Sequence, residues 1–267
     1  MTEFASVILA GERDDRDALR DETGVACKAL LDIGGRPMIL RVIDALRSAQ
    51  AIGAIHLSGP TEACVQSDAD LADLVARKEV DWVASGPSPS TSAHRMLGRF
   101  PAAQAVLITT ADHPLLTGEI VDHFCQGAAQ SGCDVVIGLA PYDLVRATYP
   151  ELKKTVLRFR DGGYCGCNLF GFLTEDGRRV ADFWRQVEKD RKKPLVVIRL
   201  LGLWSLLSYR MGWLTLDRAL ARLSARVGVR IGVVVLPFAH ASVDVDSVSD
   251  YVLVQQFSAE GRSGAQG

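Results

Sequence analysis

The sequence lacks the features that mark several specialised classes of protein. No uninterrupted apolar run reaches the roughly 20 residues that a helix needs to cross a bilayer. The N-terminus has no basic region followed by a long apolar core, as a signal peptide would have. The formal net charge is -2, and no basic stripe is interleaved with aromatic residues. We therefore expect a cytoplasmic protein that does not bind nucleic acid.

Several metal-site and catalytic motifs are also missing. The chain has 6 cysteines, but no C-x-x-C pair and no histidine at the spacing of a zinc site. It contains no G-x-S-x-G, no H-E-x-x-H and no G-x-x-x-x-G-K-[ST]. We expect reduced thiols, and neither a catalytic triad nor a P-loop kinase is favoured.

The composition and periodicity are those of a globular α/β protein. Hydrophobic residues make up 48% of the chain and charged residues 23%, which allows a sizeable core. Apolar runs of strand length alternate with helical patterns from Phe4 to Leu139. This alternation predicts a wound, mostly parallel sheet with its ligand site at the carboxyl ends of the strands. After Pro141, the segments Thr155–Phe159 and Cys167–Phe172 predict a small hairpin laid over that edge.

We expect one domain over residues 1–258, with a flexible tail over residues 259–267. Residues 190–227 read as a helical insertion, in which apolar residues recur at helical spacing between positions 195 and 214. This apolar helix either packs on the core or in a homodimer interface. Alternatively, led by the basic residues 191–193, it contacts a membrane surface or shapes a site for a lipid precursor.

The N-terminal stretch predicts a site for phosphate groups. An apolar strand ending at Leu9-Ala10-Gly11 leads into a long polar loop, and a helix opened by proline follows. Backbone N–H groups of such loops and helix N-termini favour anions. Lys28 has apolar neighbours on both sides, so its compact charge could neutralise a phosphate. The alternative is a lysine whose stem packs on the sheet while its head reaches water.

Two acidic residues follow predicted strands. Asp112 comes directly after an apolar strand that ends at Thr110, and Asp246 follows another strand and precedes a helix. Carboxylates at the carboxyl ends of strands are well placed to hold a Mg²⁺ ion that bridges phosphates. Each could instead be a helix N-cap, but two acidic strand ends are a more specific signal than one.

Two turns rich in small residues are further candidates. Gly86 to Ser92 follows the third strand, where small residues would let a base or ribose approach the backbone. Its alternative is an ordinary capped turn. The second turn contains Gly166 and Asn168, and the Asn168 amide could bind a hydroxyl or phosphate group of a second substrate.

In order along the chain, these marks resemble the nucleotidyltransferases with a Rossmann-like, glycosyltransferase-A-like fold, which include molybdenum-cofactor guanylyltransferases and methylerythritol-phosphate cytidylyltransferases. The stretches that carry the resemblance are Leu9-Ala10-Gly11 with Lys28, Gly34-Gly35-Arg36-Pro37-Met38, the serine-rich turn ending at Ser92, Thr110-Ala111-Asp112-His113-Pro114, and Asp244-Val245-Asp246-Ser247-Val248-Ser249-Asp250. The loop departs from the family pattern, because acidic residues stand where the family has glycines.

The resemblance implies a magnesium-dependent transfer of NMP from an NTP to a small phosphorylated acceptor, with release of pyrophosphate. CTP is preferred as the donor and GTP is second, and the acceptor could be a polyol or a lipid head-group precursor. The implied nucleotide-binding residues are Leu9, Ala10, Gly11, Glu12, Arg13, Lys28, Gly86, Ser92 and Asp112. Asp112 and Asp246 would hold the metal, Lys28 would act with them in catalysis, and Asn168 and Gly166 would contact the acceptor.

Two other functions fit the same sequence. One is a glycosyltransferase that uses a nucleotide sugar, in which Asp112 would again hold the metal but no pyrophosphate would be released. The other is a sensor that binds a nucleotide without turning it over, which the acidic loop after Gly11 keeps open.

Overall fold

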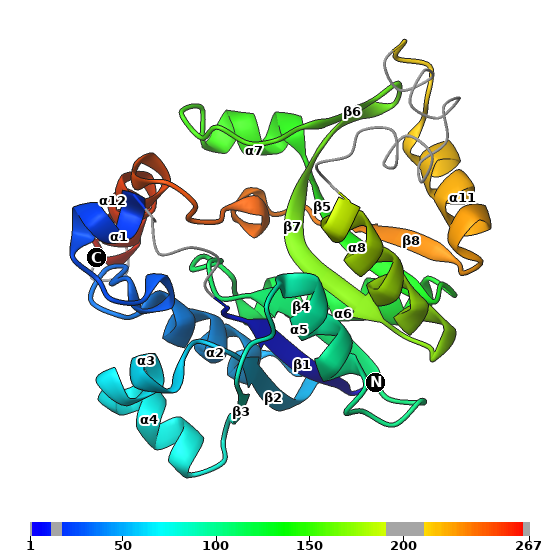
Figure 1. Ribbon diagram of the computed structural model, residues 1–267. Helices are drawn as coiled ribbons and strands as arrows, with labels where there is room; N and C mark the ends of the chain where they lie inside the picture. Colours follow the sequence, from blue (N-terminus) through cyan, green and yellow to red (C-terminus); the bar gives the residue numbers. More distant parts are fainter. Residues whose placement is uncertain (1, 12–17, 191–210, 264–267) are drawn as a thin grey trace.

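The computed structural model describes residues 2–11, 18–190 and 211–263, which fold around one eight-stranded sheet with helices on both faces (Figure 1). The strand order is β3-β2-β1-β4-β7-β5-β8, and β6 pairs with β7. The strands are β1 (Phe4–Leu9), β2 (Ile52–Ser58), β3 (Asp81–Val83), β4 (Ala105–Thr110), β5 (Val135–Pro141), β6 (Leu157–Phe159), β7 (Gly162–Phe172) and β8 (Ile231–Val235).

The helices surround this sheet. They are α1 (Ala18–Thr23), α2 (Met38–Ser48), α3 (Glu62–Ser67), α4 (Ala69–Ala76), α5 (Pro89–Leu97), α6 (Gly118–Gln130), α7 (Tyr142–Thr148), α8 (Arg179–Asp190), α11 (Leu216–Val227) and α12 (Val248–Ser263), with short 3₁₀ turns η1 (Lys28–Leu30), η2 (Asp176–Arg178) and η3 (Ala239–Ser242). Helices α5 and α8 lie side by side on one face of the sheet (Figure 1). Helices α2 and α6 contact each other and belong to a different apolar cluster.

Strand β1 lies in the interior of the sheet and runs parallel to both β2 and β4. All of its side chains are buried. A strand covered on both faces reads as a continuous apolar run, which explains the sequence pattern there. The predicted mostly parallel α/β sheet is confirmed.

Strand β7 differs most from expectation. It does form a hairpin with β6, in which Leu157 lies opposite Tyr164. From Tyr164 onward, however, β7 does not lie over the edge of the sheet but enters it, antiparallel to β5 and, over its last residues, also to β4. Cys165, Cys167 and Leu169 are therefore buried. The sequence pattern shows the hairpin but not the partners of its longer strand, because those lie far away in the chain.

Three further differences concern helices. One of the helical patterns between Phe4 and Leu139, at Ala63–Ala76, is broken into α3 and α4, because Asp68 accepts a hydrogen bond from Leu71 N and caps a new helix. Helices α1 and α7 occupy segments where no helix is expected. Helix α12 continues past Phe257 to Ser263, into the segment expected to be a polar tail.

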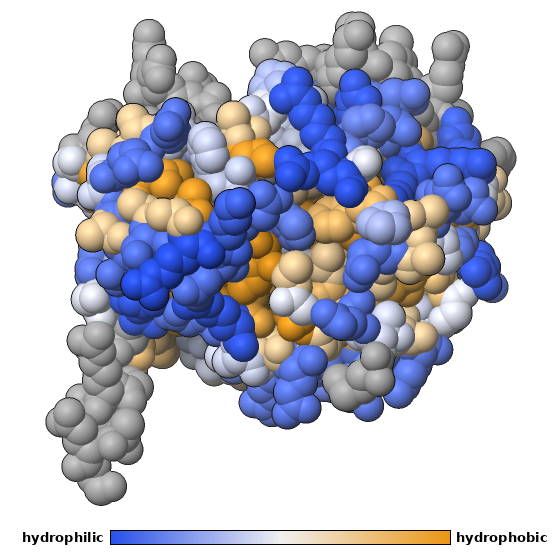
Figure 2. Space-filling model, turned by 90° about the horizontal axis from the view of Figure 1, so that it is seen from below, coloured by the Kyte–Doolittle hydropathy of each residue, from blue (hydrophilic) through white to orange (hydrophobic). Residues whose placement is uncertain are grey.

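Some expectations lie outside the described residues. Glu12 and Arg13 do, as do residues 191–210 of the insertion expected at about 190–227. Of that insertion the structure describes α11 and, before it, Leu214, which is buried. Within the described ranges, no helix is long and apolar enough to cross a membrane. Figure 2 shows one face of the molecule, where apolar residues gather toward the centre and hydrophilic residues surround them.

Candidate active site

A cavity of about 630 Å³ lies where β1 and β4 end. Most of the candidate site residues named from the sequence line this cavity. Those that line it are Leu9, Ala10, Gly11, Lys28, Gly86, Ser92, Asp112, Asn168 and Asp246. Gly166 is exposed on β7 and is not among the lining residues. The carboxyl edge of a wound sheet is where ligands bind in α/β folds.

Lys28 joins the two predicted metal ligands. Its Nζ lies 2.7 Å from Asp246 Oδ1 and 3.6 Å from Asp112 Oδ2. The Lys28 side chain is 23% exposed, and its neighbours Cys27 and Ala29 are buried. The ammonium group is therefore held at the cavity wall, where its positive charge lies beside both carboxylates.

Backbone hydrogen bonds bring these acidic segments together. Val245 N donates to Asp112 O at 2.9 Å, and Ala111 N donates to Leu9 O at 3.0 Å. Asp112 does not cap a helix, because Thr117 caps α6. Ser247 rather than the Asp246 side chain accepts from Asp250 N in the first turn of α12. Both carboxylates are thus left to face the cavity.

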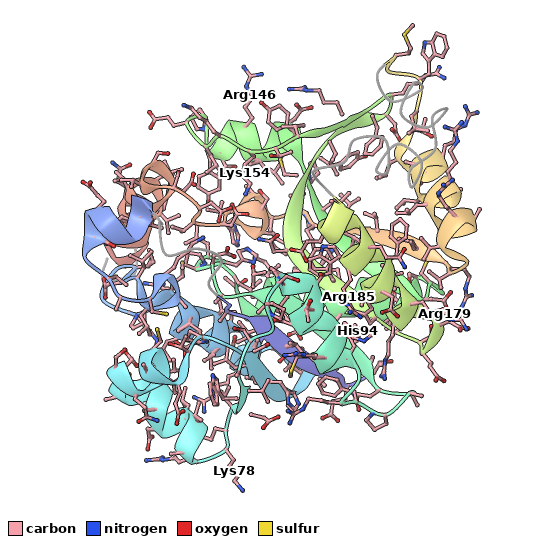
Figure 3. All side chains as sticks on the ribbon, viewed as in Figure 1. Lys78, His94, Arg146, Lys154, Arg179 and Arg185 are labelled. Atoms are coloured by element: carbon pink, nitrogen blue, oxygen red, sulfur yellow. The ribbon has the colours of Figure 1, made fainter. Side chains whose placement is uncertain are left out.

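A second polar cluster adjoins the first and contains Asn168 together with two residues that sequence reasoning missed, Asp244 and Lys154. Asp244 forms an ion pair with Lys154 and accepts a hydrogen bond from Asn168 Nδ2 at 3.3 Å. Figure 3 labels Lys154 above the sheet, in the loop before β6. Burial raises the pKa of Asp244, and the nearby charges of Asp112 and Asp246 add to this shift, while Lys154 opposes it.

Asn168 has an unusual backbone conformation. Its φ is 50°, in the left-handed region that non-glycine residues rarely adopt. Asp244 stands two residues before Asp246 in an extended segment, a spacing that could have pointed to a shared face. Lys154 had no comparable local signal, since it is one of two adjacent lysines in a polar loop.

The turn from Gly86 to Ser92 closes another side of the cavity. Gly86 N donates to Ser92 Oγ at 2.9 Å, and Ser92 is buried. Ser88 caps α5 by accepting from Thr91 N. The Ser92 oxygen therefore holds the turn in shape, and the exposed backbone around Gly86 is the part available to a ligand.

Gly59 and Gly11 allow loops to approach closely here. Gly59 has φ +80, and a Cβ on it would lie 2.9 Å from the carbonyl carbon of Ala10. A Cβ on Gly11 would lie 3.1 Å from Ser85 Cβ. Ala10 and Gly11, which follow β1, are thus packed tightly against the residues after β2 and β3, and this fixes the adjoining walls of the cavity.

His113, next to Asp112, is a buried structural residue. Burial lowers its pKa to about 4, although the backbone contact with His240 opposes that shift. With its ring neutral, Nε2 can donate to the His240 carbonyl oxygen at 3.4 Å. This contact ties the segment after β4 to η3.

The donor atoms present fit a hard divalent cation. Within the described ranges, no group of three or more His, Cys, Asp and Glu side chains is arranged to hold a metal by itself. Mg²⁺ needs fewer, since it is usually bound by one or two carboxylates, waters and the phosphates of its substrate. Asp112 Oδ1 is buried without a hydrogen-bond partner among the described residues, so an acceptor atom remains for a cation.

Fold and site together define a nucleotidyltransferase. The MobA-like NTP transferase domain family matches residues 6–152 of this chain, and the chain belongs to that family. No curated protein sequence matches it.

Several solved structures share this fold. A hypothetical transferase from Thermus thermophilus is 28% identical, has a TM-score of 0.77, and is aligned over 94% of this chain and 100% of its own. CMP:2-keto-3-deoxy-manno-octonic acid synthetase, complexed with CTP, shares 13% identity at a TM-score of 0.59, over 97% and 99% of the two chains. A 4-diphosphocytidyl-2C-methyl-D-erythritol synthase from Anaerococcus prevotii shares 11% identity at 0.57, over 96% of each chain. These two more distant matches show the fold alone.

Proposed function

We propose that this protein is a magnesium-dependent nucleotidyltransferase that transfers NMP from an NTP to a small phosphorylated acceptor, such as a polyol or lipid head-group precursor. An acceptor phosphate oxygen attacks the α-phosphorus, the bond from that phosphorus to the bridging oxygen breaks, and pyrophosphate leaves. The observation that supports this most is the convergence of Gly11, Lys28, Asp112 and Asp246 in one cavity with the Gly86 turn.

The phosphate end of the substrate would lie at Lys28 and the loop after Leu9. Asp112 and Asp246 would hold Mg²⁺, which supplies charge neutralisation on the phosphates when bound. Lys28 then turns from these carboxylates toward a phosphate oxygen, so one ammonium group stabilises the acids in the empty protein and the substrate in the complex. Such a site acts by alignment and charge stabilisation more than by acid–base chemistry.

The donor and acceptor would occupy different walls. The base or ribose would lie against the backbone around Gly86, which Ser92 holds in position. CTP is preferred over GTP, because two structures of similar fold carry names of CTP-dependent or cytidylyl chemistry. The acceptor would contact Asn168, which Asp244 holds in place. A homodimer and a lipid contact through residues 195–214 stay predictions, because most of that segment lies outside the described residues.

The test is pyrophosphate release from each of the four NTPs with Mg²⁺, with and without a pool of phosphorylated alcohols. We expect release with CTP, or with GTP as the second choice of donor, and only when an acceptor is present. Asp112→Asn and Asp246→Asn should abolish it, whereas Asp73→Asn, on α4, should not. Release that persists in both site variants would refute the metal assignment. Binding of NTP without any release would favour the sensor function.

A further inference from the structure

The cavity has an aromatic wall formed by two residues that are distant in the sequence. Phe170 lies on β7 and Trp184 on α8, and both line the cavity. Their ring centroids are 6.1 Å apart and the planes are inclined by 28°, a stacked arrangement. Both side chains are partly exposed. Part of this aromatic surface is thus available to a ligand.

This wall is tied to the Gly86–Ser92 turn. Helix α8 packs against α5 (Figure 1), and Glu188, one turn beyond Trp184, accepts hydrogen bonds from the Ser90 amide and hydroxyl. Further along, His94 Nδ1 lies 3.1 Å from Asp182 Oδ1, and Figure 3 shows His94 beside α8. The position of Trp184 is therefore fixed relative to the turn at the start of α5.

The wall and the phosphate end belong to different sides of the sheet. Phe170 and Trp184 pack on the apolar cluster that contains Ala93 of α5. The neighbours of Lys28 belong to the cluster under α2. An NTP whose phosphates lie at Lys28 would extend its base toward the α5–α8 side.

We propose that the Phe170–Trp184 wall stacks against the nucleobase of the NTP, a role that rests on the proposed function. Every base has a π face, so stacking on aromatic side chains contributes affinity with little regard to sequence. The wall would hold the face of the base, while the backbone around Gly86 and Pro87 would contact the edge of the base and distinguish one base from another. Choice between CTP and GTP would then reside in the turn rather than in Trp184.

The test compares Trp184→Leu and Trp184→Phe with the unmodified protein, using calorimetry and tryptophan fluorescence. The probes are CTP, GTP and inorganic triphosphate, each with Mg²⁺. We expect Trp184→Leu to weaken binding of CTP or GTP about tenfold or more and to leave triphosphate binding unchanged. Trp184→Phe should keep most of the affinity but lose the nucleotide-dependent quenching. Trp213→Phe, which changes a side chain that is 64% exposed, is the matched control and should keep both.

Two results would overturn the proposal. One is nucleotide affinity that Trp184→Leu does not change. The other is a Trp184 signal that responds to phosphorylated acceptors but not to nucleotide, which would assign the wall to the acceptor. Failure of the proposed function looks different, because the unmodified protein would then either bind no NTP or bind it without releasing pyrophosphate. An equal loss of triphosphate and nucleotide binding in Trp184→Leu would indicate general damage to the cavity and also contradict stacking.

Discussion

Replacing Lys28 by methionine should change metal binding and catalysis in opposite directions. Lys28 neutralises part of the charge of Asp112 and Asp246 in the empty protein. Without it, the two carboxylates would attract a divalent cation more strongly. The same change removes the ammonium group proposed to stabilise the phosphates in the transition state. Lys28→Met should therefore bind Mg²⁺ more tightly and turn over more slowly.

The size of each effect follows from the geometry. At the 3.6 Å between Lys28 and Asp112, the Coulomb attraction is about 1 kcal/mol with the screening of bulk water and about 5 kcal/mol at an effective dielectric of ~20. Asp246 is 66% exposed, and exposed pairs contribute about 0–1 kcal/mol. We therefore take about 1 kcal/mol, a five- to tenfold gain in metal affinity. Loss of one preorganised charge should lower kcat about a hundredfold or more.

The assay is a Mg²⁺ or Mn²⁺ titration without nucleotide, followed by pyrophosphate release at saturating NTP. Lys78→Met is the matched control, since Figure 3 shows Lys78 directed away from the rest of the molecule. It should change neither quantity. If Lys28→Met binds metal as the unmodified protein does and keeps its turnover, the assignment of Lys28 to this site is wrong.

Three further predictions concern stability and access. The Arg230 guanidinium lowers the pKa of Asp134 to about 2. The ionised Asp134 carboxylate therefore stabilises the folded protein fully above about pH 4, and this stabilisation is lost as pH falls through 2. Asp134→Asn should lower the free energy of unfolding at neutral pH and should make that free energy depend less on pH in acid denaturation curves. An unchanged curve would contradict this. Gly59→Ala should raise KM for NTP several-fold, because the added Cβ would clash with the Ala10 backbone. An unchanged KM would show that the backbone at Ala10 can move aside. In the native protein a thiol reagent should modify one cysteine rapidly, Cys133, because the other five are buried; rapid modification in Cys133→Ser would count against the packing.

The sequence predicts those parts of the site that depend on local order. Asp112 comes directly after β4, and parallel strands bring their carboxyl ends to one edge. Asp246 lies beyond β8 and η3, and the hydrogen bond from Val245 N to Asp112 O brings it to the same edge. Lys28 was recognisable from its apolar neighbours, because a lone charge there must face a cavity or solvent. Continuous apolar runs predict the mostly parallel sheet, because strands that are buried on both faces are apolar along their whole length.

The features of the site that the sequence does not predict depend on contacts between residues far apart in the chain. Strand β7 enters the sheet between strands from other parts of the chain, and that choice brings Asn168 to the cavity wall. Lys154 and Asp244 are 90 positions apart, so nothing local connects them. Trp184 reads as one apolar residue of an amphipathic helix, and only the packing of α8 on α5 brings it to the cavity.

Nucleotidyl transfer at the cavity of Lys28, Asp112 and Asp246 can be followed with NTP that carries a label in either the α- or the γ-phosphate, in the presence of Mg²⁺ and the acceptor pool. We expect α-label in a product that retains the acceptor, γ-label in pyrophosphate, and neither with Asp112→Asn. Both labels remaining in intact NTP, or γ-label released as inorganic phosphate, would contradict nucleotidyl transfer.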